Sequence, residues 1–290
     1  MKKNQGPPTV AKPVKLRHND KILCKDDEVN GKLHKVTELV KKASRLMLTE
    51  DYSVESKGTP SNFVTSADVA VQEFLMKELT ALLPGSGFNG EENNQQDTGH
   101  TFTWVVDPID GTCNFTRHLN QSAISVGLLE KGKMKLGVVY NPFLDDLFCA
   151  EKGKGAFLNG KPIHVSDTPF ESGLLCTAMS LYRKELAPVC FRIIEDAYGR
   201  CNDVRRFGSC ALELCYLAAG KCDLYFEIRV FPWDYTAGHL ILEEAGGILT
   251  SLDGRTLTHD RPTPLIGANN AENHRILTEI VGKYLKGIPY

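Results

Sequence analysis

The chain has 290 residues, of which 42% are hydrophobic and 24% charged. These are the proportions of a globular protein, so disorder and collagen-like structure are excluded. Thirty-four basic against thirty-six acidic side chains leave a formal net charge of -2. That balance argues against a dedicated binder of nucleic acids or membrane surfaces.

The start of the chain differs in composition from the rest. Its first 23 residues carry six basic side chains, one acidic side chain and three prolines. We therefore expect a basic, flexible tail over residues 1–30. One domain would follow over residues 31–290, with lobes at about 31–165 and 166–290.

The next segments read as two helices separated by polar residues. Apolar residues follow helical spacing over residues 33–47, and the polar stretch 56–62 breaks this pattern. A second amphipathic helix is expected over 71–82, ended by Pro84 and Gly85. Residues 85–90 match the dinucleotide-binding pattern G-x-G-x-x-G, but they follow a helix rather than a strand. We therefore predict a polar loop there.

Short strands dominate from about residue 102. An apolar segment at 102–106 leads into the sequence Asp107-Pro108-Ile109-Asp110-Gly111-Thr112. Segments 123–129 and 134–140 flank a hairpin turn, and Asn159-Gly160 reads as another tight turn.

The second half of the chain alternates between strands and helices. Strands are expected at 174–179, 223–228, 248–250 and 264–267. Helices are expected at 186–198, 209–219, 236–245 and 273–285. Strands gathered in one half and alternating elements in the other indicate a layered α+β and α/β fold.

Several features indicate a cytoplasmic protein. No apolar run approaches the ~18 residues that cross a bilayer, and the first residues lack the apolar core of a secretory signal. The nine cysteines are odd in number and irregularly spaced, with no Cys-x-x-Cys pair. Reduced, mostly buried thiols explain them better than a zinc or redox motif.

The sharpest motif places two carboxylates at the end of a strand. Asp107 and Asp110 are three residues apart, and Pro108 stiffens the turn between them. Two charges ~4 Å apart repel by about 4 kcal/mol at an effective dielectric near 20, so a divalent cation or raised pKa values must compensate. Hard oxygen ligands of this kind suit magnesium. On its own, the motif is explained equally well by a capped turn in which Asp110 bonds only nearby backbone.

Two further acidic turns favour the metal site. Glu91 and Glu92 lie in a loop flanked by glycine, and Asp234 stands just before an apolar helix. Each has an ordinary explanation, a solvated loop for the glutamates and a helix N-cap for the aspartate. Because all three acidic turns lie at the ends of predicted elements, a shared metal site explains them better than three separate ordinary roles.

The joint motif set resembles the inositol monophosphatase family. The matching segments are residues 107–112 with Asn114-Phe115, Gly90-Glu91-Glu92, and Trp233-Asp234 followed by residues 244–247. The resemblance covers residues 33–290. It implies the five-layer αβαβα sandwich of the inositol monophosphatase and fructose-1,6-bisphosphatase type. It also implies a magnesium-dependent, lithium-sensitive phosphomonoesterase that is usually a dimer.

The resemblance also implies metal ligands, residue by residue. Glu91, Asp107 and the carbonyl of Ile109 would hold the first Mg²⁺. Asp107, Asp110 and Asp234 would hold the second, and a third, weaker ion would lie near Glu91. Two or three Mg²⁺ ions are thus expected.

Further roles follow from the same resemblance. Thr112 would pair with Glu91 to orient and deprotonate the attacking water, and Asp68 would support the site. Gly111 and Thr112 would bind the phosphate, with Asp110 also in contact with the substrate. Lys57 matches a family lysine in the loop before the site.

A last group would contact the rest of the substrate. Glu227, seven residues before Asp234, would accept hydrogen bonds from ring hydroxyls. Gly208, Ser209 and Cys210 would touch the ring from the other side, and Cys210 stands where the family often has alanine. Asp234 would contact the substrate as well.

The expected activity is hydrolysis of myo-inositol monophosphate or a similar polyol phosphate by metal-activated water. The alternatives are the same chemistry on fructose 1,6-bisphosphate, histidinol phosphate or phosphoadenosine. A regulatory role, in which the basic tail contacts RNA or a partner protein, is the alternative of a different class. The expected partners are a small phosphate monoester and a second copy of the chain, without a membrane and without nucleic acid.

Overall fold

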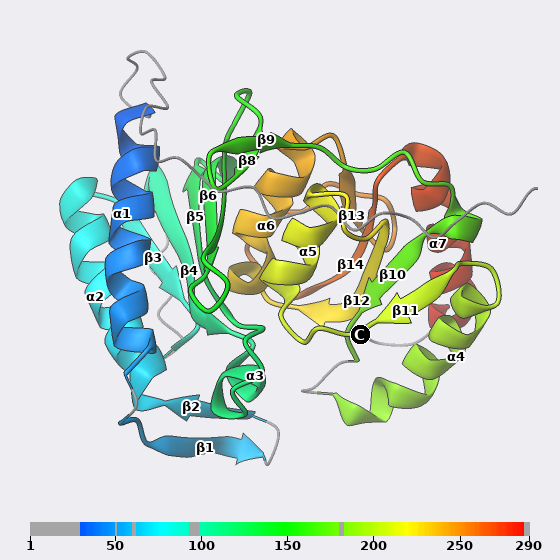
Figure 1. The fold of residues 1–290 in the computed structure, drawn as a ribbon, viewed down its shortest axis with the longest axis horizontal. Helices are drawn as coiled ribbons and strands as arrows, with labels where there is room; N and C mark the ends of the chain where they lie inside the picture. Colours follow the sequence, from blue (N-terminus) through cyan, green and yellow to red (C-terminus); the bar gives the residue numbers. More distant parts are fainter. Residues whose placement is uncertain (1–29, 50, 60–61, 93–98, 180–182, 287–290) are drawn as a thin grey trace, which may run out of the picture.

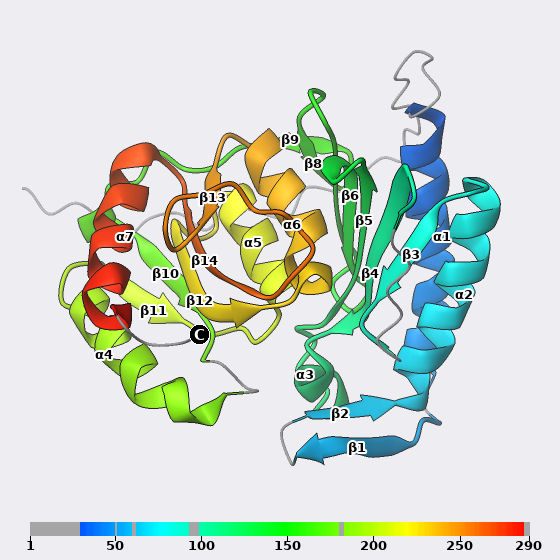
Figure 2. The same ribbon diagram turned by 180° about the vertical axis from the view of Figure 1, so that it is seen from behind.

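The computed structural model describes residues 30–49, 51–59, 62–92, 99–179 and 183–286. The predicted tail lies outside these residues except for Asn30, which begins the first helix. The described chain forms five layers, visible from left to right in Figure 1 and in reverse order in Figure 2. Helices alternate with two sheets, so the predicted αβαβα sandwich is confirmed. The lobe boundary near residue 165 remains a prediction.

The larger sheet has seven strands in the order β3-β4-β5-β6-β7-β8-β9. Its strands are β3 (Gly87–Gly90), β4 (Phe102–Asp110), β5 (Ala123–Glu130), β6 (Lys133–Asn141), β7 (Asp146–Glu151), β8 (Ala156–Leu158) and β9 (Lys161–Ile163). Only β3 and β4 run parallel. The predicted hairpins are present, because β5 pairs with β6 and β8 pairs with β9 across Asn159-Gly160.

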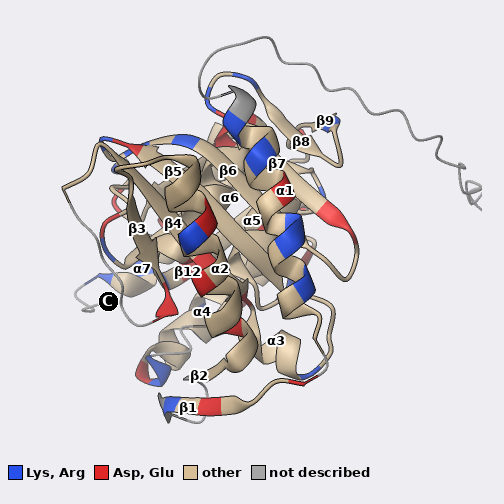
Figure 3. Ribbon diagram, turned by 90° about the vertical axis from the view of Figure 1, so that its left-hand side faces the viewer, with Lys and Arg blue, Asp and Glu red and all other residues tan. Residues whose placement is uncertain are grey.

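Helices α1 (Asn30–Met47) and α2 (Ser66–Leu82) cover the outer face of this sheet. On α1, Val36, Val40, Ala43 and Met47 of the predicted apolar stripe are fully buried against α2 and the sheet, and Leu39 is half-buried. The other side of α1 is rich in lysine and faces solvent (Figure 3). This division into an apolar and a charged face explains why the helix lies flat on the sheet.

The smaller sheet has five strands in the order β11-β10-β12-β14-β13. Its strands are β10 (Leu174–Thr177), β11 (Asp203–Arg205), β12 (Leu224–Val230), β13 (Ile248–Ser251) and β14 (Thr263–Ala268). Strands β10, β11 and β12 are parallel, and the remaining pairs are antiparallel. Helices α4 (Ala187–Tyr198) and α7 (Ala271–Leu285) pack on its outer face.

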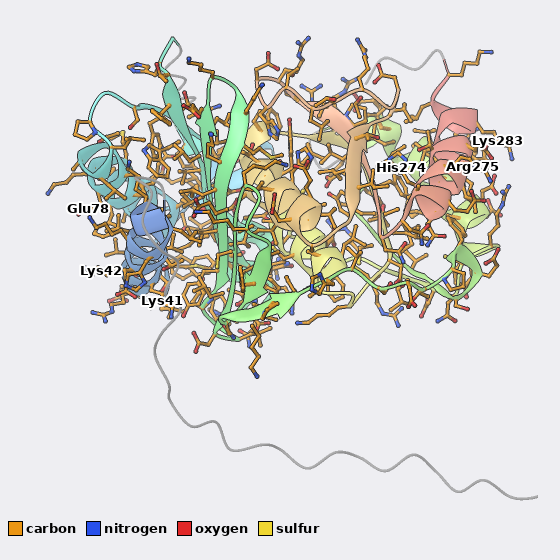
Figure 4. The ribbon with its side chains drawn as sticks, turned by 90° about the horizontal axis from the view of Figure 1, so that it is seen from above. Lys41, Lys42, Glu78, His274, Arg275 and Lys283 are labelled. Atoms are coloured by element: carbon orange, nitrogen blue, oxygen red, sulfur yellow. The ribbon has the colours of Figure 1, made fainter. Side chains whose placement is uncertain are left out.

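Seen from above, the two outer helical layers lie at opposite ends of the molecule (Figure 4). Lys41, Lys42 and Glu78 mark α1 and α2 at one end, and Arg275 and Lys283 mark α7 at the other. Between them, α5 (Cys210–Ala218) and α6 (Pro232–Glu244) fill the space between the sheets. Every residue of α5 is buried, as expected for a helix with a sheet on each side.

Two segments differ from the sequence-based expectation. The stretch predicted as a break forms a hairpin of β1 (Val54–Thr59) and β2 (Asn62–Thr65). The prediction of a loop over residues 85–90 is wrong, because residues 87–90 form the strand β3. Pairing with β4 and burial of Phe88 outweigh the low strand propensity of its glycines.

Eight of the nine cysteines lie among the described residues, all with free thiols and six of them buried. Most of these thiols are therefore buried, as the sequence predicts. No helix in the described segments is both long and apolar enough to span a membrane.

Candidate metal centre and active site

The strand β4 carries two of the predicted metal ligands at its buried end. Asp107 and Asp110 are 2% and 8% exposed. The pairing of β4 with β5 shifts by one residue between them, which is the signature of a β-bulge. The backbone N–H of Ile109 donates to Asp107 Oδ1 over 3.0 Å and holds this irregular turn in place.

The third carboxylate comes from the first turn of α6. The helix begins at Pro232, earlier than predicted, so Asp234 lies inside the helix and not before it. Its Oδ2 accepts a hydrogen bond from the N–H of Phe231 over 2.9 Å. The helix approaches the sheet closely at Gly127, where a Cβ would lie 2.7 Å from the side chain of Thr236. This close packing brings Asp234 to the end of β4.

The side chains of Asp107, Asp110 and Asp234 form what we call the carboxylate cup. One oxygen of each lies within 4.8 Å of an oxygen of the others. No lysine or arginine of the described chain forms an ion pair with any of the three. Three acidic groups this close need a cation between them, or bound protons, to offset their repulsion.

The surroundings of the cup oppose ionisation when no cation is present. Burial, followed by the charges of Glu91, Asp110 and Asp234, raises the pKa of Asp107 well above its ordinary value. Burial likewise raises the pKa of Asp234, and Asp110 and Glu91 add to the effect. Burial raises the pKa of Asp110 to about 6, although hydrogen bonds from Ser209 and Ala211 partly counter it.

The two oxygens of Asp110 have different surroundings. Oδ2 accepts hydrogen bonds from the Ser209 hydroxyl and the Ala211 N–H, both over 2.6 Å, at the start of α5. These bonds fix the carboxylate against the positive end of the helix. Because Oδ2 is held in this way, we expect Oδ1 to be the oxygen that Asp110 offers to a cation.

Glu91 lies beside the cup but is turned toward a lysine. It follows β3 directly, and its N–H donates to the carbonyl of Val106 over 3.2 Å. Its Oε1 accepts a hydrogen bond from Lys57 Nζ over 3.0 Å, and the same ammonium lies 2.7 Å from Glu92. Glu91 is therefore close enough to raise the pKa of Asp107, but its carboxylate does not belong to the group of three.

Lys57 stands on the β1–β2 hairpin, in the stretch that sequence reasoning treated as a break. Burial lowers its pKa, but the charges of Glu91 and Glu92 outweigh this and raise it overall. The lysine therefore stays charged at neutral pH. It offsets the negative charge of the two glutamates.

Asp68 and Thr112 also lie at this end of the sheet. Asp68 forms a capping box with Thr65 at the start of α2, while its Oδ1 is buried without a hydrogen-bond partner. Burial raises its pKa to about 7. Thr112 begins the short helix α3 (Thr112–Thr116), and its hydroxyl donates to the Ile109 carbonyl over 3.1 Å.

A second acidic group lies next to the cup on the other sheet. Glu227 of β12 accepts a hydrogen bond from the Tyr225 hydroxyl over 2.8 Å, and that hydroxyl lies 3.1 Å from Cys210 Sγ. Burial raises the pKa of Glu227 to about 7, and the charge of Asp110 contributes. Glu227, Cys210 and Asp110 are thus near one another, and their role as substrate contacts stays a prediction.

Sequence reasoning missed Glu213, which is fully buried on α5. Its Oε1 accepts the N–H groups of Phe207 (2.6 Å) and Gly208 (3.1 Å), while Oε2 has no hydrogen-bond partner. Burial raises its pKa to about 8. The available signal was a single glutamate within an otherwise apolar helix, since such a residue is seldom buried without a role.

Asn114, part of the motif that follows residues 107–112, makes contacts that the sequence did not predict. Its Nδ2 lies 2.7 Å from the Gln121 carbonyl and 2.6 Å from the Phe207 carbonyl. It thereby ties α3 to the loop before α5. This contact joins the two sheets at the site.

We expect stabilisation by Mg²⁺ to grow as the pH rises. The folded-state pKa values of Asp110 (about 6) and Asp68 (about 7) exceed their ordinary value of 3.8. The metal-free fold therefore binds more protons than the unfolded chain. The stability that these protons contribute is lost as the pH rises through the two pKa values. A bound cation replaces those protons and removes the loss.

The measurement is the melting temperature in excess Mg²⁺ minus that in chelator, at about pH 5.5 and about pH 8. At ~1.4 kcal/mol per pKa unit and ~2–4 °C per kcal/mol, this difference should be larger by about 5 °C at the higher pH. A difference that does not change with pH would contradict the assignment of the cup as a cation site.

Comparison with known proteins agrees with this geometry. The family model described as "Inositol monophosphatase family" matches residues 27–285. The chain is 36% identical to the Nus factor SuhB of Escherichia coli over 208 residues, which cover 71% of this chain and 78% of that protein. It is 32% identical to the inositol-1-monophosphatase of Bacillus subtilis over 234 residues, covering 79% and 88%.

Among solved structures, the IMPase of Thermotoga maritima superposes with a TM-score of 0.80 at 30% identity. The match covers 89% of this chain and all of that one. The family model spans nearly the whole described chain. The chain belongs to the inositol monophosphatase family.

Proposed function

We propose that the protein is a Mg²⁺-dependent phosphatase that hydrolyses myo-inositol monophosphate or a similar polyol phosphate. The observation that carries the proposal is the carboxylate cup, in which three carboxylates converge within 4.8 Å without a basic partner in the described chain. Membership of the inositol monophosphatase family supports the phosphatase chemistry.

The donor set fits magnesium. Carboxylate oxygens are the ligands that Mg²⁺ prefers, usually one or two of them together with waters and a substrate phosphate. We propose two or three ions, held by Asp107, Asp110 and Asp234, with Glu91 and the Ile109 carbonyl as further ligands. Two ions close together supply a water of lowered pKa and neutralise the charge of the phosphoryl oxygens.

The protein's own residues would position the reactants. Glu91 and the Thr112 hydroxyl would orient the attacking water, and the Glu91 carboxylate would accept its proton. In this structure the Thr112 hydroxyl donates a hydrogen bond to the Ile109 carbonyl at the end of β4. Asp68, buried between Thr65 and the acidic groups, would support this arrangement. The N–H groups of Gly111 and Thr112 would bind the phosphate.

In this structure the Lys57 ammonium donates hydrogen bonds to the carboxylates of Glu91 and Glu92. A cation beside Glu91 would take over part of that charge compensation. We therefore propose that the ion pair of Lys57 with Glu91 loosens when the site is loaded.

The polyol would contact the second sheet. Glu227 would accept hydrogen bonds from ring hydroxyls, and the loop of Gly208, Ser209 and Cys210 would form the opposite wall. Tyr225 supports both sides, because its hydroxyl lies within hydrogen-bond distance of Glu227 and Cys210.

A panel of phosphate esters tests the proposal. The full-length protein with Mg²⁺ is assayed for phosphate release from inositol 1-phosphate, fructose 1,6-bisphosphate, histidinol phosphate and phosphoadenosine, ranked by kcat/KM. We expect inositol 1-phosphate or another polyol phosphate to rank first. A clear preference for histidinol phosphate or phosphoadenosine would overturn the substrate, and no phosphate release from any ester would overturn the activity.

We also propose that the enzyme is a lithium-sensitive homodimer of the cytoplasm, which family membership supports. Li⁺ titration of the phosphatase activity tests the first property, and light scattering of the purified protein tests the second. A monomeric protein whose phosphatase activity is unchanged by Li⁺ would contradict both proposed properties.

A further inference from the structure

The carboxyl ends of three parallel strands lie beside the carboxylate cup. Strands β11, β10 and β12 lie side by side, with Cys176 paired to both Arg205 and Tyr225. Arg206 comes directly after β11, and Glu227 lies just past the last residue of β12 that pairs with β10. Ligands of open α/β sheets bind at such carboxyl ends.

The loop that follows β11 is fixed at its backbone. The carboxylate of Glu213 accepts two consecutive N–H groups, those of Phe207 and Gly208. The amide of Asn114 donates to the Phe207 carbonyl over 2.6 Å, and Ser209 donates to Asp110 over 2.6 Å. The backbone that carries Arg206 is therefore held in place next to the cup.

Arg206 has a side chain without a strong partner. It is exposed, and it makes no hydrogen bond or ion pair with any described residue. Its neighbour Arg205, by contrast, is paired with Asp203. One guanidinium nitrogen of Arg206 lies 3.3 Å from the position that a Cβ on Gly208 would occupy, so the group lies over the wall of the proposed substrate site.

Glu227 interacts electrostatically with the cup and with the loop that follows β11. Glu227 senses the charge of Asp110, which raises its pKa, and the charge of Arg206, which lowers it. Glu227 therefore lies within Coulomb range of both the cup and Arg206. The cup, a group suited to hydroxyls and an arginine with no partner among the described residues are therefore neighbours.

We infer that Arg206 forms a second anion subsite, which recognises a phosphate or carboxylate on the far end of a phosphorylated polyol. The planar guanidinium offers paired N–H donors that match such a group. A sugar bisphosphate would place its reacting phosphate at the cup, its hydroxyls at Glu227 and its second phosphate at Arg206. The inference rests on the proposed function and refines its substrate class.

A simpler role for Arg206 predicts a different result. If the guanidinium only offsets the charge of Glu227, its removal affects substrates with one and two phosphates alike. If it binds a second anion, the effect depends on the substrate. The ratio of the two activities separates these roles.

The experiment compares wild type and Arg206→Gln, as full-length proteins with Mg²⁺, on inositol 1-phosphate and fructose 1,6-bisphosphate. A charge-assisted hydrogen bond is worth about 10- to 100-fold in affinity, so the ratio of kcat/KM for the bisphosphate over the monophosphate should fall by that factor, mainly through KM. Arg200→Gln is the matched control, because Arg200 is an exposed arginine already paired with Asp196. It should leave the ratio unchanged.

A ratio within about threefold of wild type in Arg206→Gln overturns the inference. If the wild type releases phosphate from neither substrate, the proposed function fails instead. Calorimetric titration with fructose 1,6-bisphosphate then still tests the subsite. Weaker binding to Arg206→Gln supports it, and equal binding to both proteins overturns it.

Discussion

Replacing Asp110 with asparagine is expected to lower kcat/KM for phosphate release by about 1,000-fold. Metal ions supply several kcal/mol of transition-state charge stabilisation, and each ~1.4 kcal/mol is tenfold in rate. The asparagine oxygen can still accept the hydrogen bonds that Ser209 and Ala211 give to Asp110. The amide nitrogen, however, would face the cup, where it donates hydrogen bonds and repels a cation.

The fold should survive this substitution. Removing one of three crowded acidic groups relieves repulsion, so the metal-free melting temperature of Asp110→Asn should equal or exceed that of wild type. Asp253→Asn, in a surface turn where Arg255 pairs with the aspartate, is the control and should keep full activity. Activity of Asp110→Asn within tenfold of wild type would show that Asp110 does not hold a catalytic cation.

Replacing Gly111 with alanine is expected to lower kcat/KM by about 100-fold, because displacements near 1 Å at a reacting site have that effect. Gly111 has φ = +87°. An added Cβ would lie 2.9 Å from the Gln121 carbonyl oxygen and 3.1 Å from that of Gly208. Both contacts are with backbone, so the turn that carries Thr112 must move.

The chain offers a matched control for this substitution. Gly132, in the β5–β6 turn, has φ = +75° and nothing within 4 Å of an added Cβ. Gly132→Ala therefore carries the same backbone strain, about 1–2 kcal/mol, without the collision. It should lower the melting temperature slightly and leave kcat/KM unchanged. Equal losses of activity in both variants would mean that general destabilisation, and not the position of Thr112, is responsible.

The sequence predicted most of the fold because local pattern and burial agree. The stripe on α1 from Val36 to Met47 and the alternating elements after residue 174 carry their structure in their spacing. The strand β3 was missed because its four residues include two glycines, and only the neighbouring strand β4 gives them extended structure. The β1–β2 hairpin was missed because β1 is mostly polar and β2 has only four residues, so no apolar alternation marks it.

The site was predictable to a different degree at each residue. Asp107 and Asp110 share one strand, so their proximity follows from their spacing. The approach of Asp234 depends on how closely α6 packs at Gly127, which no local pattern reveals. The turn of Glu91 toward Lys57 depends on the missed hairpin, and the loop contacts of Glu213 depend on long-range packing. Family resemblance supplied what spacing did not.

The most direct test of the carboxylate cup is to titrate Mg²⁺ into protein that has been stripped with chelator, and to follow phosphate release from inositol 1-phosphate. The account predicts no release without the ion and a saturable recovery as Mg²⁺ is added. Phosphate release that proceeds at the same rate in chelator would contradict it, since three clustered carboxylates without a cation cannot assist the hydrolysis of an anionic ester.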